Sequence, residues 1–255
     1  MPTNSALQWL TQTQQQAVRS VEKLTGLTAC SQLVTLENGE RYVLRNQNQR
    51  ASNFGVDYQQ ESQILAQIRP LAIAPDPLYA NAQQSLLSWI DGSVPTEFSS
   101  DLLQKLAEQL AKLHRFKLQA VSSNQNFTIL NLTERCHFLW QKLPAQKQAE
   151  LPFSPPFPQI EPFAHALCHH DLHLGNLVEQ GDKLFIIDWE YAAVSDPALD
   201  LALFLHANPL SEAEQAVFFQ HYFAKSPLDL TACRTKIAEY QPLIAMLNQL
   251  WYAFG

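Results

Sequence analysis

Long apolar stretches are absent from this 255-residue chain. No run approaches the roughly 18 consecutive apolar residues of a membrane-spanning helix, so we expect no membrane insertion. The first residues, Met-Pro-Thr-Asn-Ser, also lack the basic and then apolar segments of a secretory signal. Cysteine is scarce, and the four cysteines are scattered with no paired spacing, as expected for free thiols in a reducing compartment. These absences together predict a cytoplasmic protein.

A positive charge balance is lacking as well. The chain has 17 Lys and Arg residues against 24 Asp and Glu residues, a net charge of −7. Proteins that bind nucleic acid usually carry a basic face, so nucleic acid is not an expected partner. An acidic chain suits a cationic small molecule, although many proteins are acidic. With 46% hydrophobic residues, the chain is long enough to bury two small cores or one large core.

What the sequence does contain is a dense polar motif between residues 168 and 188. His169, Asp171 and Asn176 fit the pattern H-x-D-x-x-x-x-N, and a later apolar run ends at Asp188. In the kinase fold, this layout gives one carboxylate to the hydroxyl nucleophile, while an asparagine and a second aspartate hold the metal ions that bridge the nucleotide phosphates. Asp171 is therefore the candidate base, and Asn176 and Asp188 are candidate ligands of Mg²⁺.

A β-hairpin is predicted between the two candidate metal ligands. Gly181-Asp182 lies between two β-prone stretches, residues 176–179 and 183–187. This arrangement is typical of a hairpin turn. Because a hairpin folds back on itself, we expect Asp188 to return to the neighbourhood of Asn176. The oxygen ligands that Mg²⁺ prefers would then meet in one place.

The histidines of this region allow a second interpretation, a zinc site. His165 and His169 are four residues apart, as on one helical face, and His170 and His173 follow closely. No cysteine pair flanks them, and residues 166–168 are typical of a short buried strand rather than a metal-binding helix. The kinase interpretation explains more positions together. It leaves His169 as a structural residue at the head of the loop and treats His170 and His173 as loop residues.

The residues around the motif resemble the aminoglycoside phosphotransferase and choline kinase superfamily. Residues 187–192, Ile-Asp-Trp-Glu-Tyr-Ala, and residues 196–202, Asp-Pro-Ala-Leu-Asp-Leu-Ala, are similar to its I-D-[WFY]-E and D-P-x-x-D-L-A motifs. The Asp-Trp-Glu-Tyr form is most similar to choline, ethanolamine and thiamine kinases, whereas protein kinases carry Asp-Phe-Gly there. The resemblance implies a two-lobed protein-kinase-like fold of the α+β class, with ATP and Mg²⁺ as cofactors. It also implies that Asp200 braces the catalytic loop.

The hydrophobic pattern predicts two lobes, residues 1–91 and 92–255, divided at the break around Gly92. The first, nucleotide-binding lobe is expected to be a small antiparallel sheet, with helices over 8–24 and 57–69 and strands at 32–36, 41–45, 78–79 and 85–90. The second, catalytic and substrate-binding lobe is expected to be mainly helical, with helices over 100–118, 131–143, 197–206, 211–224 and 229–253. The Pro-rich residues 151–162 cannot form a helix. His114, near the end of the helix expected over 100–118, is expected to be structural.

A kinase also needs a cation on its third strand that contacts the phosphates, tied by an acid from the next helix. Arg45 and Glu61 occupy these places, and an arginine can fork onto two phosphate oxygens. The loop at residues 26–33 resembles the family pattern G-L-[ST]-G-G-S-x-L, but it has Ala29 and Cys30 in place of two glycines. Thr28 and Ser31 remain as candidate phosphate contacts. Weak nucleotide binding, or a catalytically weak pseudokinase, is therefore an alternative.

The acceptor pocket is expected to use carboxylates and aromatic faces, which hold small cationic alcohols. Glu190 and Tyr191 follow the candidate metal ligand. The resemblance places an aromatic-rich late helix beside the choline pocket, and Trp251 and Tyr252 fit that position, with Trp140 as a further candidate. The sequence thus predicts an ATP-dependent phosphotransferase acting on the hydroxyl of choline, ethanolamine or thiamine. An aminoglycoside-type phosphotransferase is the other enzyme that fits.

Overall fold

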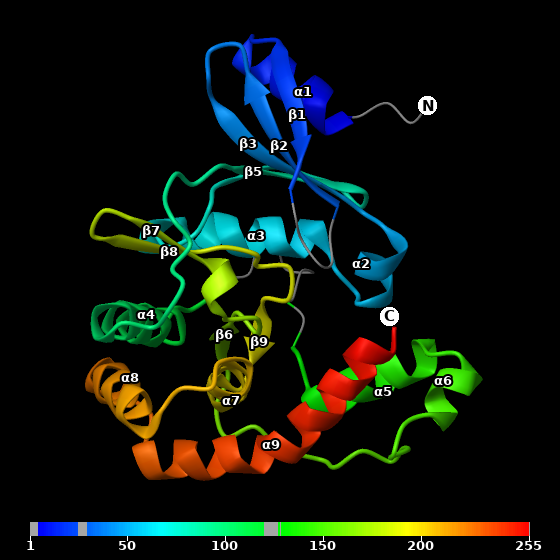
Figure 1. Cartoon of the computed structure of the whole chain (residues 1–255), viewed down its shortest axis with the longest axis vertical. Coiled ribbons are helices and arrows are strands. Elements are labelled where there is room, and N and C mark those ends of the chain that lie inside the picture. The colour runs from blue at the N-terminus through cyan, green and yellow to red at the C-terminus, as the bar shows by residue number, and fades with distance from the viewer. Residues whose placement is uncertain (1–4, 25–29, 120–126, 128, 255) are drawn as a thin grey trace. The chain divides into compact units, whose positions relative to one another are not determined.

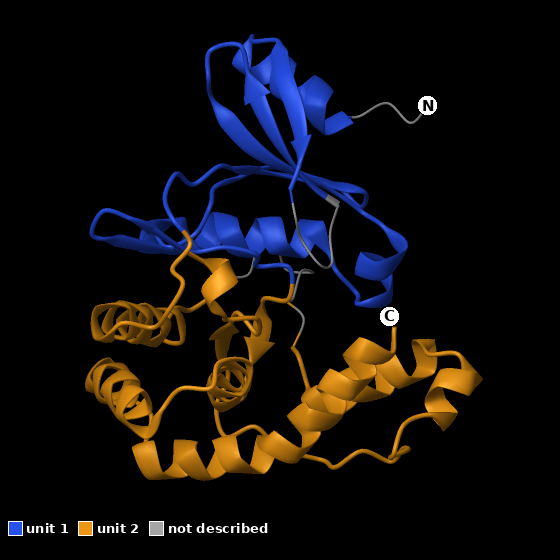
Figure 2. Ribbon diagram, in the orientation of Figure 1, with its two compact units in different colours: residues 1–93, 178–190 blue, residues 94–177, 191–255 orange. Residues whose placement is uncertain are grey.

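The computed structural model describes residues 5–24, 30–119, 127 and 129–254, and the fold is of the α+β class (Figure 1). The chain forms two compact units (Figure 2). Unit 1 comprises residues 1–93 and 178–190, and unit 2 comprises residues 94–177 and 191–255. No described helix is both long and apolar enough to cross a membrane. The functional division into a nucleotide-binding lobe and a catalytic lobe stays a prediction.

Unit 1 is built on a five-stranded sheet with the strand order β1-β2-β3-β5-β4. Neighbouring strands are antiparallel, and their bounds are β1 Val18–Lys23, β2 Cys30–Leu36, β3 Arg41–Asn46, β4 Pro77–Ala80 and β5 Gln84–Ser88. The predicted Asn-Gly turn joins β2 to β3, and Gly39 takes a φ of +87° that favours glycine. The register places Arg45 opposite Ser31 on β2 and opposite Ser85 on β5.

Among the described residues of unit 1, three α-helices accompany this sheet, with the bounds α1 Ser5–Gln14, α2 Gln49–Asn53 and α3 Tyr58–Ile68. The predicted helix after Asp57 is confirmed, because the Asp57 carboxylate caps α3 by accepting hydrogen bonds from the backbone N–H groups of Gln59 and Gln60. A 3₁₀ turn, Arg69–Leu71, follows α3. The apolar face of α3 buries Ile64, Leu65 and Ile68, as the periodicity predicted.

The hairpin predicted before Asp188 is also confirmed, with β7 at Leu177–Gln180 and β8 at Lys183–Ile186. It is fixed within unit 1 by a β-bridge between Ser93 and Glu179 and by a 2.7 Å hydrogen bond from the Ile186 N–H to the Ile73 carbonyl. Residues 178–190 therefore belong with the sheet of unit 1, although they follow the polar loop of unit 2 in the chain.

The predicted helix over residues 8–24 is wrong in its second half. Helix α1 ends at Gln14, the next residue takes a φ of +53°, and β1 begins at Val18. Residues 18–23 pair with β2, and Val18 lies opposite Leu36 at the edge of the core. The pairing with β2 thus overrides the local helical pattern, because a strand gains its ladder from a partner that is distant in sequence.

Unit 2 combines one small strand pair with six helices among its described residues. Strands β6 Ala166–Cys168 and β9 Ala193–Ser195 are antiparallel. The helices are α4 Ser100–Leu113, α5 Leu132–Lys142, α6 Ala145–Ala149, α7 Pro197–Ala207, α8 Glu212–Lys225 and α9 Leu230–Ala253. The five helices expected here are confirmed, except that α4 ends at Leu113 in a turn instead of continuing to residue 118. Residues 151–162 contain neither helix nor strand, as predicted.

The packing of unit 2 fixes the start of α7, which matters for the site. Helix α4 buries its leucine stripe and packs on α8, while α7 packs on α9 and against β6. Asp196 caps α7 by accepting from the N–H of Ala198, and Pro197 occupies the first helical position. The first turn of α7 therefore carries Asp200 into the interior, where it is 1% exposed.

Candidate active site

Unit 1 contains a buried ion cluster around Arg45. One terminal nitrogen of its guanidinium donates to Glu61 from the first turn of α3, and both side chains are buried. The other terminal nitrogen lies 3.0 Å from Asp188 Oδ1 and 3.7 Å from Glu190 Oε2. The structure therefore brings the predicted cation, the predicted acid and the candidate metal ligand together within one unit.

The electrostatics of this cluster keep Arg45 charged. Burial alone would lower the pKa of the guanidinium, but Glu61, Asp188 and Glu190 together raise it above its ordinary value. The ring of Tyr58 lies 5.3 Å from the guanidinium carbon and covers it. An arginine suits this place because its planar fork can meet several carboxylate oxygens at once, which a lysine ammonium cannot do with the same geometry.

Asp188 is held in a conformation that is uncommon for a residue other than glycine. Its φ is +65°, in the left-handed region. The next residue, Trp189, is fully buried and donates a 2.8 Å hydrogen bond from its indole N–H to the Ile186 carbonyl, so the backbone after β8 is fixed. The side chain of Asp188 is 35% exposed. Besides its contact with Arg45, it can thus offer a hard oxygen to a divalent cation, which fits Mg²⁺.

The polar loop of unit 2 holds the carboxylate of Asp171. The amide nitrogen of Asn176 donates to the Asp171 carbonyl at 2.8 Å and to its carboxylate at 3.1 Å. A short 3₁₀ turn, Leu174–Asn176, returns Asn176 to Asp171, and the ring of His173 caps that turn by accepting from the N–H of Gly175. Because these bonds use the amide nitrogen of Asn176, its amide oxygen is the atom that can bind a cation. The predicted closeness of Asn176 to Asp188 joins the two units and stays a prediction.

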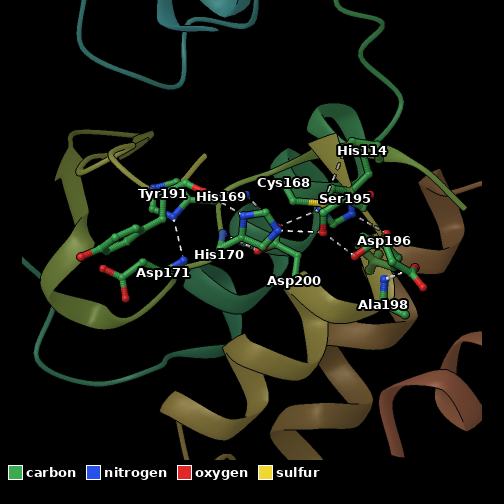
Figure 3. Close-up of polar contacts among 12 residues, drawn as sticks. His114, Cys168, His169, His170, Asp171, Tyr191, Ser195, Asp196, Ala198 and Asp200 are labelled. Carbon is green, nitrogen blue, oxygen red and sulfur yellow. Dashed lines mark hydrogen bonds and ion pairs between the residues drawn. The ribbon is translucent and has the colours of Figure 1, made fainter. Parts of the chain in front are cut away.

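His169 and Asp200 hold the backbone of this loop (Figure 3). The ring of His169 accepts a 3.2 Å hydrogen bond from the N–H of Asp171. The ring thus holds a backbone N–H of the loop. The Asp200 carboxylate accepts from the N–H of His169 at 3.1 Å and from the N–H of His170 at 2.7 Å. The contact expected from the family resemblance, in which Asp200 braces the loop, is therefore present.

His114 completes the brace on the other side of Asp200. Its Nε2 lies 3.0 Å from the Asp200 carboxylate, and its Nδ1 lies 2.7 Å from the Tyr222 hydroxyl on α8. Burial alone would raise the pKa of Asp200, but its hydrogen bond and charge interaction with His114, aided by His170 and His169, hold that pKa far below the usual range. His114 links α4, α7 and α8, which confirms its predicted structural role.

Sequence reasoning treated His170 as an ordinary loop residue, and the structure gives it a defined place. Its φ is +68°, and its ring lies 3.0 Å from the Tyr191 carbonyl and 2.8 Å from the Ser195 hydroxyl. Burial is the main cause that lowers the pKa of this histidine. The contact of the ring with Ser195 depends on β9, a strand that the sequence pattern did not predict. No local feature of the sequence therefore indicated a special role for His170.

The residues predicted to bind the acceptor are divided between the two units. Glu190 is buried beside Arg45 in unit 1. Tyr191 begins the next stretch of unit 2, where the Arg135 guanidinium carbon lies 5.8 Å from its ring. Trp251 and Tyr252 lie in the last turn of α9 with their ring centroids 5.7 Å apart, and Tyr252 is 75% exposed.

Two further residues predicted to bind substrate or nucleotide, Trp140 and Ser31, lie among the described residues. Trp140 packs with Phe153 and Phe157 in an aromatic cluster, at centroid distances of 6.3 and 6.2 Å. Ser31 lies on β2 beside Arg45, as the sheet register requires. Thr28 lies outside the described residues.

The zinc interpretation gains no support from the described part of the chain. His165, His169, His170 and His173 do not gather there as possible ligands of one ion. The group with suitable spacing is His114, Cys168 and Asp200, whose ligand atoms lie within 4.8 Å of one another. Its carboxylate is already engaged by two backbone N–H groups and by the His114 ring.

Comparisons with known proteins show the family of this chain. The sequence model of the phosphotransferase enzyme family (APH) matches residues 31–238. A thiamine kinase of Shigella boydii is 27% identical over 238 residues, covering 90% of this chain and 80% of that protein. A LicA homolog of Metamycoplasma hominis is 28% identical over 160 residues, and the alignment spans 60% of this chain and 61% of that relative.

Solved structures share the fold. The choline kinase LicA from Streptococcus pneumoniae superposes with a TM-score of 0.73 at 19% identity, over 98% of this chain and 91% of that one. A structure of LicA in complex with AMP gives a TM-score of 0.70 at 19% identity, covering 100% of this chain and 90% of that chain. The predicted protein-kinase-like fold of the α+β class is therefore confirmed.

Proposed function

Because the chain belongs to the phosphotransferase enzyme family, we propose that it is a small-molecule kinase that transfers the γ-phosphoryl group of ATP to the hydroxyl of choline, ethanolamine or thiamine. The observation that carries this proposal is the shared contact of Arg45 with Glu61 and Asp188. A phosphate-binding cation, its acid partner and a metal ligand are the parts that phosphoryl transfer requires at the nucleotide.

The residues of unit 1 would bind the nucleotide phosphates and orient them. Arg45 has the fork geometry for two phosphate oxygens, and Glu61 keeps its guanidinium in place. Asp188 supplies a carboxylate oxygen for a divalent ion, and Asn176 of unit 2 supplies an amide oxygen. ATP with Mg²⁺, when bound, supplies the transferable phosphoryl group and neutralises charge on its oxygens.

The residues of unit 2 would act on the acceptor. Asp171 accepts the hydroxyl proton as the acceptor oxygen forms its bond to the γ-phosphorus and the bond from that phosphorus to the β–γ bridging oxygen breaks. The proton ends on the Asp171 carboxylate, and ADP leaves with the electron pair of the broken bond. Asn176 and the backbone contacts from His169 and Asp200 orient this carboxylate before the acceptor arrives.

The acceptor class is supported by the names of the relatives, which include a thiamine kinase and a choline kinase. Choline and thiamine are both cationic alcohols. Aromatic rings attract such cations through their faces. Tyr191 comes three residues after Asp188, and the pair of Trp251 with the exposed Tyr252 offers further aromatic faces. These side chains are the proposed contacts for the acceptor, with Glu190 contributing through Arg45.

The test is Mg²⁺-dependent turnover of ATP with a panel of choline, ethanolamine, thiamine and an aminoglycoside. The wild-type protein and Asp171→Asn are compared with Asp182→Asn, a matched change in the exposed hairpin turn. We expect turnover of at least one cationic alcohol, unchanged by Asp182→Asn and reduced by roughly 10²–10⁴-fold by Asp171→Asn. Binding of ATP without turnover of any alcohol would instead identify a nucleotide-binding module. Turnover of the aminoglycoside alone would overturn the acceptor class.

A further inference from the structure

One histidine of the catalytic loop makes contacts that proton transfer itself does not require. The ring of His170 lies between the Tyr191 carbonyl, at 3.0 Å from Nδ1, and the Ser195 hydroxyl, at 2.8 Å from Nε2. Figure 3 shows this ring beside Tyr191 and Ser195, with Asp171 as the next residue of the loop. All these residues belong to unit 2.

The partners of the ring determine its tautomer. A backbone carbonyl can only accept a hydrogen bond, so Nδ1 of His170 must carry the proton and donate to Tyr191. In the neutral ring Nε2 then accepts, and the Ser195 hydroxyl donates to it. The same hydroxyl lies 3.4 Å from the Asp196 carbonyl, which offers it an alternative acceptor. The direction of the contact therefore depends on the charge of the ring, because the hydroxyl donates to a neutral ring and would accept from a protonated one.

The backbone of His170 is held as firmly as its ring. Its N–H donates to Asp200 at 2.7 Å, and its φ of +68° lies in the left-handed region, which costs free energy for a residue other than glycine. Such a conformation persists only when its surroundings hold it. Here the contacts of the ring with Tyr191 and Ser195 help to stabilise this conformation. Asp171 is the next residue in the chain.

We propose that His170 is a positioning residue: its neutral ring couples the Tyr191–Ser195 segment to Asp171 and so orients the carboxylate that accepts the hydroxyl proton. This role rests on the proposed function, because it concerns the geometry of the same base. A displacement of about 1 Å at a catalytic group can lower a rate by about 100-fold. In this role His170 acts through Asp171 and does not touch the substrate. Because Tyr191 is a proposed acceptor contact, the same ring links acceptor binding to the base.

The surroundings of His170 also predict a pH dependence. The charged or titratable groups that face it are Asp200 from α7, His114 from α4 and Arg135 from α5. Protonation would turn Nε2 into a donor and force the Ser195 hydroxyl to turn toward the Asp196 carbonyl. Burial lowers the pKa of His170, so the neutral ring is the resting form near pH 7.

The experiment compares His170→Gly, His170→Asn and Ser195→Ala with the control His165→Gly, a change at an exposed histidine. Glycine accepts the backbone conformation but removes the ring, while asparagine tolerates the conformation and can still donate to the Tyr191 carbonyl. We expect His170→Gly to lower kcat about 10- to 100-fold with KM for ATP changed less than about 2-fold, and His170→Asn to recover part of the loss. The double variant with Ser195→Ala should be no worse than His170→Gly alone, because both changes break one contact.

A second readout does not require turnover. In the wild-type protein, ¹⁵N signals of His170 should report the Nδ1–H tautomer, and Ser195→Ala should change its Nε2 signal. The ¹³C carboxyl signal of Asp171 and its titration midpoint should shift in His170→Gly and not in His165→Gly. An unchanged Asp171 signal, or an unchanged kcat, overturns the positioning role. A parallel loss of ATP affinity and melting temperature in His170→Gly would also overturn it, since that pattern describes a folding defect. If the wild type phosphorylates no alcohol, the proposed function fails, and the carboxyl signal still decides the coupling.

Discussion

The guanidinium of Arg45 lies 3.0 Å from the carboxylate of Asp188, although the two residues are 143 positions apart in the chain. Arg45 lies on β3, the middle strand of the sheet, and Asp188 follows the β7–β8 hairpin. The proposed phosphate cation and the proposed metal ligand are thus already paired within unit 1 before any nucleotide binds. Nucleotide binding would then start from an ordered cluster of side chains. Because these side chains need not be ordered on binding, the free-energy cost of binding is lower.

The first prediction concerns the stability of this cluster. Arg45→Met removes the cation from the buried carboxylates of Glu61 and Glu190. Leaving a buried charge without its partner costs about 3–5 kcal/mol, so the free energy of unfolding in urea should fall by that amount. Arg41→Met is the matched control on the same strand, since its ion pair with Asp91 is exposed and should contribute less than about 1 kcal/mol.

A double variant separates the charge effect from lost packing. Arg45→Met combined with Glu61→Leu removes both charges of the closest pair. We expect it to recover part of the stability lost by Arg45→Met, because an apolar pair can replace a buried ion pair. Equal unfolding free energies for Arg45→Met and Arg41→Met would show that the buried cluster is not held by its charges.

The second prediction concerns the metal ligand. Asp188→Asn keeps a residue that tolerates the left-handed φ of +65° and removes the negative charge. We expect the concentration of Mg²⁺ needed for half-maximal activity to rise at least about 10-fold, because an amide binds a hard cation more weakly than a carboxylate does. The melting temperature should stay close to that of the wild type. A normal Mg²⁺ dependence in this variant would remove Asp188 from the metal site.

How far the sequence determines the fold can be judged from the elements around Arg45. The Asn38-Gly39 turn and the spacing of Ile64, Leu65 and Ile68 specify the β2–β3 hairpin and α3 by local chemistry alone. Residues 18–23 form a strand only because β2 offers its edge, and nothing local distinguishes them from a continuing helix.

The same contrast holds at the site. Asp171, Asn176 and Asp188 were recognised because the chemistry fixes their spacing, and the family resemblance pointed to Asp200. The contacts of His170 depend on Tyr191 and Ser195, which are 21 and 25 positions away, so they arise from the pairing of β6 with β9. The contact of Glu190 with Arg45 likewise depends on tertiary structure. A sequence pattern can identify a carboxylate, but it does not show which charged group that carboxylate contacts.

The third prediction uses the pH dependence of Asp200. The pKa of Asp200 is lowered in the folded protein. The ionised carboxylate therefore stabilises the fold at pH values above its ordinary pKa of 3.8, and this contribution is lost as the pH falls from there through the pKa of the folded protein. Asp200→Asn should reduce the free energy of unfolding by about 2–4 kcal/mol at pH 7, because the Asp200 contacts to His114 and the loop backbone weaken. The difference from the wild type should narrow below about pH 4. A difference that stays constant down to the acid transition would contradict the assigned ionisation.

The last prediction tests the aromatic pair at the end of α9. Tyr252 is 75% exposed, so Tyr252→Ala should change the free energy of unfolding by less than about 0.5 kcal/mol. If its ring holds a cationic acceptor, the variant should raise KM for choline about 2- to 5-fold, the equivalent of roughly 0.5–1 kcal/mol for an exposed cation–π contact. The neutral isostere 3,3-dimethylbutan-1-ol should show no such change, because it has the same shape without the charge. Phe163→Ala, at another partly exposed aromatic residue, is the control. Equal effects on both alcohols would assign Tyr252 to packing around the acceptor, and no effect on either would remove Tyr252 from the acceptor site.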